Sequence, residues 1–543
     1  MSEDGSGAHG CQERPSGVFE RKALAARASV VAAGTLVSRS LGLVREMVFA
    51  ALFRRAETDA FYVAFAIPNA LRLLLAEGAA SSAVVPVLVE TRQRCGSGEV
   101  RRAMAALRGL WLTVLLTVSV LGIVFAPALC ELFAAGARAQ PGQFERTVLL
   151  TRWVFPFLLL AGLAALGSAA LHTHRQFAVP ALSPALINVA FIVFAVGAPL
   201  HLTLRGFDPS LALALGALAG GGLAVAAHWP SLRRLGYLTL PRFQPSHPAV
   251  REVLRRIVPM AFGMGVYFVN IAVSRRLLSD LGEGPQSYFT WAFRLCALPQ
   301  GLFAMALSTA ALPSLATLAA AGEREEVADT CAHGVRLGLF VGLPASTMLV
   351  VLGHPLVVAL FQRGEFGRAA ALETSAALIT QALGIGAVVV VRQLVPAFFA
   401  YGDTRTPVLA STVNLVCFVT MATSLRGTLG HPGVGLALSA ANVAQLVVLW
   451  VLLSRQLPSL RLGPIVRSAG RTLLVCAGAA AVGWLSARWI GLPTDASWLQ
   501  RLLPGLGGAA VFGVGFLACA RLLRAPELSE IGTSLRRRLT APQ

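Results

Sequence analysis

The chain has 543 residues, of which 56% are hydrophobic and only 13% are charged, and its mean hydropathy is +0.69. A soluble globular protein carries about 25% charged residues, so this composition excludes a soluble fold and indicates a membrane protein with many spans. The net charge of +20 raises the question of nucleic-acid binding. However, the arginines lie mostly between apolar runs rather than on a polar face beside aromatic residues. We therefore expect no nucleic-acid partner and attribute the basic residues to membrane topology.

A helix needs about 20 apolar residues to cross the hydrocarbon core, and by that measure the chain contains about fourteen candidate spans. The second, eighth and tenth spans are interrupted by proline or charge, as in AIPNALRLLLAEGAAS and VVVVRQLVPAFF. Broken helices are tolerated in a membrane only where they face protein or a water-filled cavity. The expected fold class is an all-α polytopic membrane protein. The predicted spans are 28–53, 60–89, 107–134, 147–171, 177–202, 208–229, 250–279, 286–319, 330–361, 369–401, 406–426, 432–454, 464–490 and 498–523.

Basic residues gather in alternate connections between the predicted spans. They are dense at 92–108, at 233–256 and at 455–471, and both tails add more. The intervening connections carry few, such as Arg205 or Arg426. By the positive-inside rule this distribution places both termini in the cytosol, which implies an even number of spans.

The two halves of the chain resemble each other. VVPVL at 84–88 resembles ALPSL at 311–315, and the stretches that contain Asn188 and Asn414 also align. The repeat spans six helices, so both halves share one orientation. Parallel repeats are typical of one class of transporter, with the substrate site where the repeats meet. We expect a disordered cytosolic tail (1–27), an N-terminal six-helix lobe (28–229), a basic cytosolic loop (230–249), a C-terminal six-helix lobe (250–455), two extra helices (456–524) and a basic cytosolic tail (525–543).

Once the basic residues near the span ends are assigned to the connections, five arginines remain inside the predicted spans. An arginine facing lipid at mid-bilayer costs roughly 2.5–3.5 kcal/mol, so a hydrated central cavity is the expected environment. Such a cavity favours a ligand of high negative charge density, because guanidinium groups match phosphate oxygens in pairs. Four are predicted to bind the substrate, whereas snorkelling to the interface explains Arg392 equally well. The four are Arg39, Arg45, Arg72 and Arg294.

Acids near these arginines are scarce. Glu46 and Glu77 are the membrane-embedded acids, and we expect them to support the arginines. Asp59 and Glu57 begin the second span, where acids interact favourably with the helix dipole. For these two residues that structural explanation is as good as a functional one, and Asp59 is kept as a candidate supporting acid.

Spacing limits how the first two arginines could act together. Arg39 and Arg45 lie about 120° apart on an ideal helix. Gly42 between them is therefore a candidate hinge. The eight cysteines are scattered, and the chain has no HExxH motif, nucleophile elbow or phosphate loop. We expect neither a metal site nor an enzyme.

Several stretches together resemble one family: VSRSLGLVREMVFAALF, TDAFYVAFAIPNALRLLLAEGAASSAVVPVL, FAVPALSPALINV, LFQRGEF and FFAYGDTRTPV. They are similar to the bacterial lipid II flippases of the MurJ (MviN) family, within the multidrug/oligosaccharidyl-lipid/polysaccharide exporter superfamily. The resemblance runs from about residue 28 to 455. It implies two lobes in the bacterial cytoplasmic membrane that move an undecaprenyl-pyrophosphate-linked disaccharide pentapeptide outward by alternating access. The last two helices would line a groove for its polyprenyl tail.

The resemblance also carries individual residues. Glu46 stands where the family usually has aspartate, Leu73 replaces a second arginine, and Ala297 replaces an acid found in some members. No acid occurs between Asp403 and Asp495, so sodium coupling and other cofactors are not expected, whereas membrane potential could drive transport. Membrane lipids and the cell-wall synthesis machinery are expected partners. The family's essential arginines fall on Arg39, Arg45, Arg72 and Arg294, and its acids on Asp59 and Glu77.

Two alternatives remain at this point. A sister exporter of drugs or of another polyprenyl-linked glycan would share the fold but would use membrane acids for cation coupling. A membrane enzyme acting on polyprenyl phosphates would need a base or a carboxylate cluster that binds metal beside the arginines.

Overall fold

The structure is a computed structural model that describes residues 17–73, 83–263, 265–301, 305–491, 498–530 and 533, and the regular elements in these ranges are helices. Most are α-helices, η3 (Ala135–Ala139) is a 3-10 helix and η5 (Leu503–Gly507) is a π-helix. In the first half they are α1 (Gly17–Leu52), α2 (Arg55–Arg72), α3 (Val85–Val124), α4 (Ala126–Ala134), α5 (Gln143–Val154), α6 (Pro156–Thr173), α7 (Ala178–Gly197), α8 (Pro199–Leu204) and α9 (Leu211–Arg234). In the second half they are α10 (Pro248–Gly263), α11 (Gly265–Ser279), α12 (Pro285–Pro299), α13 (Met305–Ala321), α14 (Arg324–Val351), α15 (Gly353–Phe361), α16 (Arg368–Ala382), α17 (Ile385–Ala400), α18 (Arg405–Gln456), α19 (Leu462–Ile490), α20 (Trp498–Leu502) and α21 (Gly508–Leu522).

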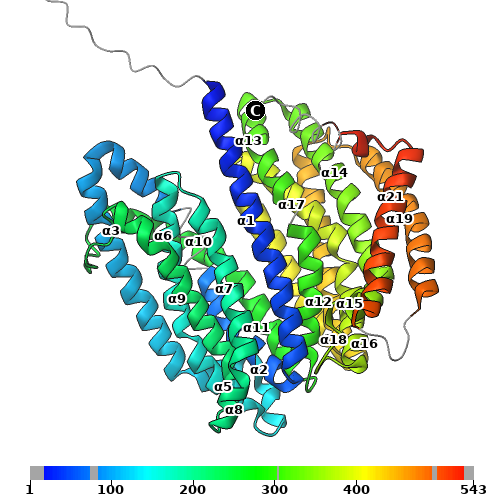
Figure 1. The fold of residues 1–543 in the computed structure, drawn as a ribbon. Coiled ribbons are helices and arrows are strands. Elements are labelled where there is room, and N and C mark those ends of the chain that lie inside the picture. Colours follow the sequence, from blue (N-terminus) through cyan, green and yellow to red (C-terminus); the bar gives the residue numbers. More distant parts are fainter. Residues whose placement is uncertain are drawn as a thin grey trace, which may run out of the picture.

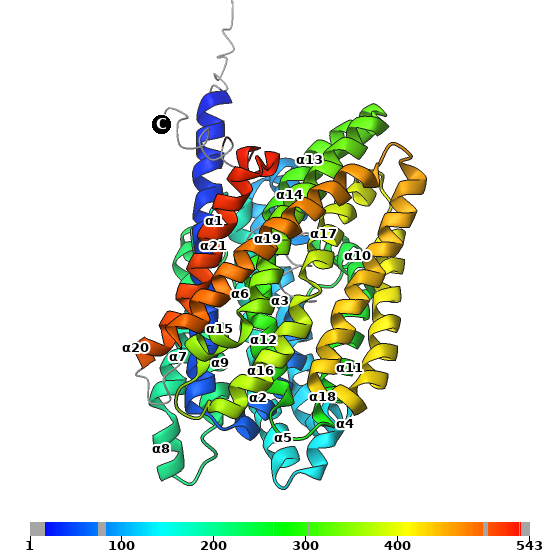
Figure 2. The same cartoon turned by 90° about the vertical axis from the view of Figure 1, so that its right-hand side faces the viewer.

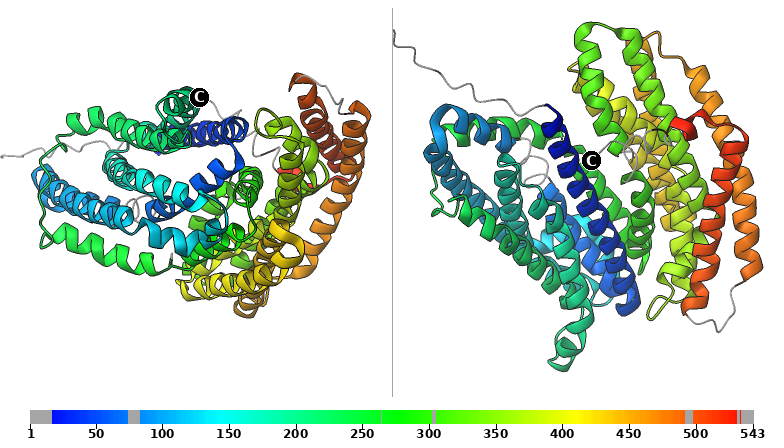
Figure 3. Two further views of the ribbon diagram at one scale, coloured as in Figure 1. Left: turned by 90° about the horizontal axis from the view of Figure 1, so that it is seen from below. Right: turned by 45° about the horizontal axis from the view of Figure 1, so that its top comes forward.

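The helices form two lobes that pack together at one end and diverge toward the end where α1 begins (Figure 1). In the first lobe α7 packs between α1 and α9, and in the second α17 packs between α14 and α18. Helices α19 and α21 pack against each other, and α19 also covers α14 on the outer side of the second lobe (Figure 2). The view with the top tilted forward shows the same divergence of the lobes (Figure 3).

The described helices agree with a polytopic membrane fold. Nine helical segments among the described residues are long and apolar enough to cross a membrane. One of them, α18, contains two of the predicted spans, because it turns back at Gly430, where φ is +63°. Hydrogen bonds from Asn414 to Asn442 and from Gln445 to Ser411 join its two arms. The helices are therefore compatible with the predicted count of fourteen spans.

Two boundaries differ from the sequence prediction at the start of the chain and in the tenth span. Helix α1 already begins at Gly17, inside the predicted disordered tail. The tenth span breaks at Gly384, between α16 and α17, and not at Arg392 or Pro396, which lie inside α17. At this break the Ser439 hydroxyl donates hydrogen bonds to backbone carbonyls at the end of α16, so the open helix end is satisfied inside the protein.

Part of the predicted C-terminal lobe contacts the N-terminal lobe. Three apolar residues of α10, namely Val250, Val253 and Ile257, lie in a core cluster with Leu107 and Trp111 of α3. The first half of the seventh span thus packs on the N-terminal lobe, because its apolar face is covered by α3. The second half, α11, packs against α18 of the other lobe and against α4.

An apolar core crosses from one lobe to the other at the end where they meet. Aromatic rings fill much of it: Phe49 and Phe191 meet edge to face with centroids 5.7 Å apart, and Trp291 and Phe366 do so at 5.2 Å. Such aromatic pairs contribute about 0.5–1.5 kcal/mol beyond their buried area. This core holds the closed end and places α1, α2 and α12 beside one another.

Candidate functional site

Glu46 is the centre of a charged cluster at the boundary between the lobes. The residue is 0% exposed, and its carboxylate accepts hydrogen bonds from Arg45 and from the hydroxyl of Tyr62. Arg294 reaches the same carboxylate from α12, with its Nε 3.3 Å from Oε1 of Glu46. Two guanidinium groups therefore share one carboxylate, and the cluster keeps a net positive charge.

Arg45 is enclosed by protein. It is 8% exposed, its Nη1 donates to Oδ1 of Asn188 at 3.0 Å, and its guanidinium lies 5.1 Å from the ring centroid of Phe191. Asn188 in turn donates from Nδ2 to the backbone carbonyl of Ser38 at 3.0 Å, which ties α7 to α1. In this conformation Arg45 therefore holds the carboxylate of Glu46 in place, although the sequence predicted a direct contact with substrate.

The side chains of Arg294 and Arg39 are more exposed than that of Arg45, and both lie beside or on α12. The Arg294 side chain is 45% exposed. Arg39 donates from Nη1 to the carbonyl of Ala297 at 3.2 Å, and its guanidinium lies against Gly301, where any Cβ would collide with it. Arg392 of α17 is close enough to interact electrostatically with Arg39. Arg39 of one lobe thus lies beside the helix of the other lobe that carries Arg294.

Arg72 joins this group from the end of α2. Its Nε and Nη2 donate to Oδ1 of Asn69 at 3.2 and 3.1 Å. Tyr267 of α11 lies near Arg72, Arg275 and Arg294. Arginines that are far apart in the sequence therefore lie around one tyrosine.

The two acids that begin α2 have different partners. Glu57 accepts a hydrogen bond from the backbone amide of Arg54 at 2.9 Å, so it caps its own helix. Asp59 is 3% exposed and accepts from the backbone amides of Gly284 (2.6 Å) and Ser287 (2.8 Å), at the start of α12. Asp59 therefore caps a helix of the other lobe and joins the lobes at their closed end.

Gly42 and Glu77 are the remaining predicted residues. Helix α1 runs without interruption through Gly42, which faces the side-chain amide of Asn188. A hinge at this glycine stays a prediction. Glu77 lies outside the described residues.

Several residues of the cluster are not among the predicted site residues. Trp291 donates from Nε1 to the hydroxyl of Tyr62 at 2.8 Å, and the guanidinium of Arg55 lies 5.0 Å from the Trp291 ring centroid. Arg275 donates from Nη1 to Oε1 of Gln286 at 2.9 Å. Of these residues, Arg275 carries a sequence signal, because it forms with Arg276 a pair of charges near the end of the predicted span 250–279. The other contacts depend on how the lobes meet.

Two helical lobes, joined at one end and carrying a cationic cluster at their boundary, define a multi-pass membrane transporter. The family model described as "Lipid II flippase MurJ" matches residues 48–492. The chain belongs to this family of lipid II flippases. The match includes Asp59, Arg72 and Arg294 and begins just after Arg45 and Glu46.

Individual relatives agree with this assignment, and two solved structures share the fold. A lipid II flippase MurJ of Burkholderia cenocepacia is 32% identical over 422 residues, which cover 77% of this chain and 81% of the relative. A probable lipid II flippase MurJ of Vibrio cholerae is 31% identical over 516 residues, covering 91% and 96%. The fold is similar to a structure of a lipid II flippase MurJ in an inward closed conformation, with a TM-score of 0.73, 23% identity and coverage of 91% and 99%. An inward-facing multidrug transporter of the MATE family has a TM-score of 0.63, at 17% identity and coverage of 78% and 95%.

Proposed function

We propose that this chain moves lipid II from the inner to the outer leaflet of the bacterial cytoplasmic membrane by alternating access between its lobes. Membership in the MurJ family supports the substrate. The observation that carries the site is the side chain of Arg294, which is 45% exposed while its Nε lies 3.3 Å from the buried carboxylate of Glu46 in the other lobe. Lipid II is the peptidoglycan precursor in which a disaccharide pentapeptide is linked to undecaprenyl pyrophosphate.

The charges of the site suit a pyrophosphate. Guanidinium groups bind phosphate oxygens through two parallel hydrogen bonds, and such charge-assisted bonds are roughly twice as strong as neutral ones. Arg294 and Arg39 supply these groups along α12. Arg45 and Glu46 orient Arg294, because the buried carboxylate of Glu46 fixes the direction in which the Nε of Arg294 points. We infer that Arg45 acts as a positioning residue in this state.

The arrangement of the lobes supports a direction for the movement. If both termini lie in the cytosol, as the positive-inside distribution predicts, the lobes diverge toward the cytosol, from which the precursor is loaded. Opening to the other side would require the Asp59 contact with α12 to break. Exposed apolar side chains on α19 and α21, such as Leu474 and Val514, are suited to the polyprenyl tail. Membrane potential could drive the return step, because moving one charge changes the energy by about 2.3 kcal/mol per 100 mV.

Lipid II accessibility in cells depleted of their native flippase tests this function. We expect this chain to restore cleavage of lipid II by an enzyme added from outside. The Arg294→Ala variant should lower that cleavage at least about tenfold, which corresponds to the loss of one charge-assisted contact of about 1.5–3 kcal/mol. Arg205→Ala is the matched control, because Arg205 is exposed in the connection between α8 and α9.

Immunoblots of the membrane fraction must show equal amounts of each variant. Outer-leaflet lipid II that does not respond to the wild-type chain would contradict the function and favour a sister exporter of another glycan. If the wild type is active and Arg294→Ala is equally active, the proposed site is contradicted but the proposed function is not.

A further inference from the structure

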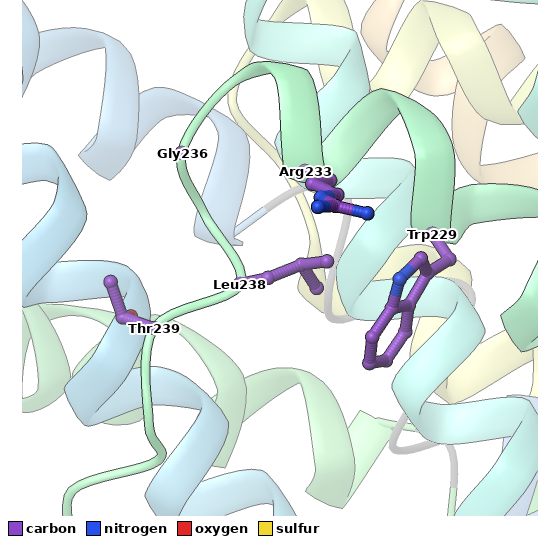
Figure 4. Close-up of a pocket in the computed structure, with 5 residues that line it drawn as sticks. All are labelled: Trp229, Arg233, Gly236, Leu238 and Thr239. Atoms are coloured by element: carbon purple, nitrogen blue, oxygen red, sulfur yellow. The ribbon is translucent and has the colours of Figure 1, made fainter.

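A pocket lies away from the lobe boundary, between the end of α9 and the connection that follows it. Its volume is about 380 Å³, within the range of about 300–1,000 Å³ that is usual for small-molecule sites. Figure 4 shows the indole of Trp229 and the guanidinium of Arg233 near the side chain of Leu238. The lining residues are Trp229, Arg233, Gly236, Leu238 and Thr239.

The wall of this pocket is held rigidly by the protein. Arg108 of α3 donates from Nη1 to the carbonyls of Tyr237 (2.9 Å) and Thr239 (2.8 Å). The Tyr237 side chain is buried, and its hydroxyl lies 2.7 Å from Nε2 of His174. Gly236 makes the turn with a φ of +70°, a conformation that favours glycine. The pocket is therefore formed before any ligand arrives.

The chemistry of the lining pairs a cation with apolar groups. Trp229 and Arg233 are four residues apart on α9 and so share one face of the helix. No acidic residue occurs between Asp208 and Glu252, and among the described residues Arg233 forms no ion pair. The Arg233 side chain is exposed, and no carboxylate in the described part of the chain neutralises it, so it is available to an anion.

The position of the pocket points to a membrane surface. Gly34 of α1 lies against Ala181 of α7, and Gly216 of α9 against Phe191 of α7, so α9 ends on the side where α1 begins. Beside the pocket, Leu240 is 84% exposed and Phe243 is also exposed. Tryptophan, arginine and exposed apolar side chains together are typical of the membrane–water interface.

We propose that this pocket binds the head group of an anionic glycerophospholipid. Arg233 contacts the phosphate, the indole of Trp229 lies at the level of the head groups, and the acyl chains leave along Leu238 toward Leu240. Basic pockets at the cytoplasmic ends of membrane helices bind such head groups, and an arginine that contacts the head group contributes about a five-fold gain in affinity. This lipid site is separate from the proposed transport site and does not depend on the identity of the transported lipid.

The test is native mass spectrometry of the full-length protein in detergent, titrated with phosphatidylglycerol and, in parallel, with phosphatidylcholine. We expect the wild-type chain to retain phosphatidylglycerol preferentially. Arg233→Gln should weaken that binding about five-fold. The control Arg234→Gln removes the same charge one residue further on, outside the lining of the pocket, and should bind like the wild type.

Trp229→Ala is the second variant, and it should also weaken binding of phosphatidylglycerol. Inorganic phosphate at millimolar concentration distinguishes the source of the anion: it should not displace the lipid. Equal losses in Arg233→Gln and Arg234→Gln, no preference over phosphatidylcholine, or displacement by inorganic phosphate would each overturn the proposal.

Discussion

Glu46 is the residue on which the charge balance of the lobe boundary depends. Replacing it by glutamine removes the negative charge between Arg45 and Arg294 but keeps a hydrogen-bond partner for Tyr62. Removing one partner of a buried ion pair costs about 3–5 kcal/mol, because the other charge stays buried. Since Glu46 and Arg45 are 0% and 8% exposed, we expect Glu46→Gln to lower the free energy of unfolding by about 3 kcal/mol. A lower apparent melting temperature of the purified variant would report this loss of stability.

Glu46→Asp is the matched control, because it keeps the charge and shortens the side chain by one methylene. It should lose much less stability than Glu46→Gln. If both variants melt at the temperature of the wild type, the carboxylate is not the counter-ion that the structure indicates.

Much of the cluster, but not its internal contacts, could be predicted from the sequence. An arginine in an apolar run is expensive in lipid, so the sequence alone singles out Arg39, Arg45 and Arg294. The enclosure of Arg45 by Asn188 could not be predicted in this way, since it requires α7 to pack against α1. Local patterns indicate which side chains need a partner, whereas tertiary packing decides which partner they find.

At the scale of elements, Gly430 divides α18 into two spans. Its φ of +63° and ψ of −143° define a conformation that glycine adopts readily and that costs a residue with a Cβ roughly 1–3 kcal/mol. Gly430→Ala should therefore lower the free energy of unfolding by about that amount. Thermal unfolding of the purified protein measures this loss of stability. The control is Gly427→Ala, because Gly427 lies three residues away in ordinary helix and a Cβ added there would have no atom within 4 Å. Equal stability of the two alanine variants would contradict the assignment of this turn.

The start of α12 gives a second prediction. Asp59→Asn replaces one accepting oxygen by an NH₂ group and removes the charge that favours a helix N-terminus. We expect faster hydrogen exchange of amides at 284–288, measured by mass spectrometry of the full-length protein. Glu57→Gln is the control, since Glu57 caps α2 and its loss should leave α12 unchanged. Slow exchange at α12 in Asp59→Asn would rule out this cap.

Element boundaries show why the fold was only partly predictable. The apolar spans could be recognised because they must cover about 30 Å of hydrocarbon. The break at Gly384 was placed wrongly at Arg392 and Pro396, since proline can remain inside a helix where neighbouring groups satisfy the freed carbonyl. The true break lies at Gly384, where the hydroxyl of Ser439, a residue of another helix, satisfies the open end of α16.

For the whole molecule, the internal repeat predicted two lobes, but it could not predict which end of them is closed. Both conformations of an alternating-access transporter belong to one sequence, and their free energies differ by only a few kcal/mol. The closed end seen here rests on contacts between α2 and α12. Among them, Oγ1 of Thr58 lies 2.6 Å from Oγ of Ser287, and both residues are fully buried.

This contact offers a direct test of rocking between the lobes. Cysteines at both positions, Thr58→Cys with Ser287→Cys, would bring two sulfur atoms within reach of a disulfide, because the native oxygen atoms already touch. The exposed Cys95 is replaced by serine to prevent side reactions. We expect oxidation to abolish the appearance of lipid II in the outer leaflet and a reductant to restore it, whereas each single cysteine variant stays active under both conditions. Transport by the fully oxidised double variant would mean that the lobes need not separate at this end, and alternating access through it would have to be abandoned.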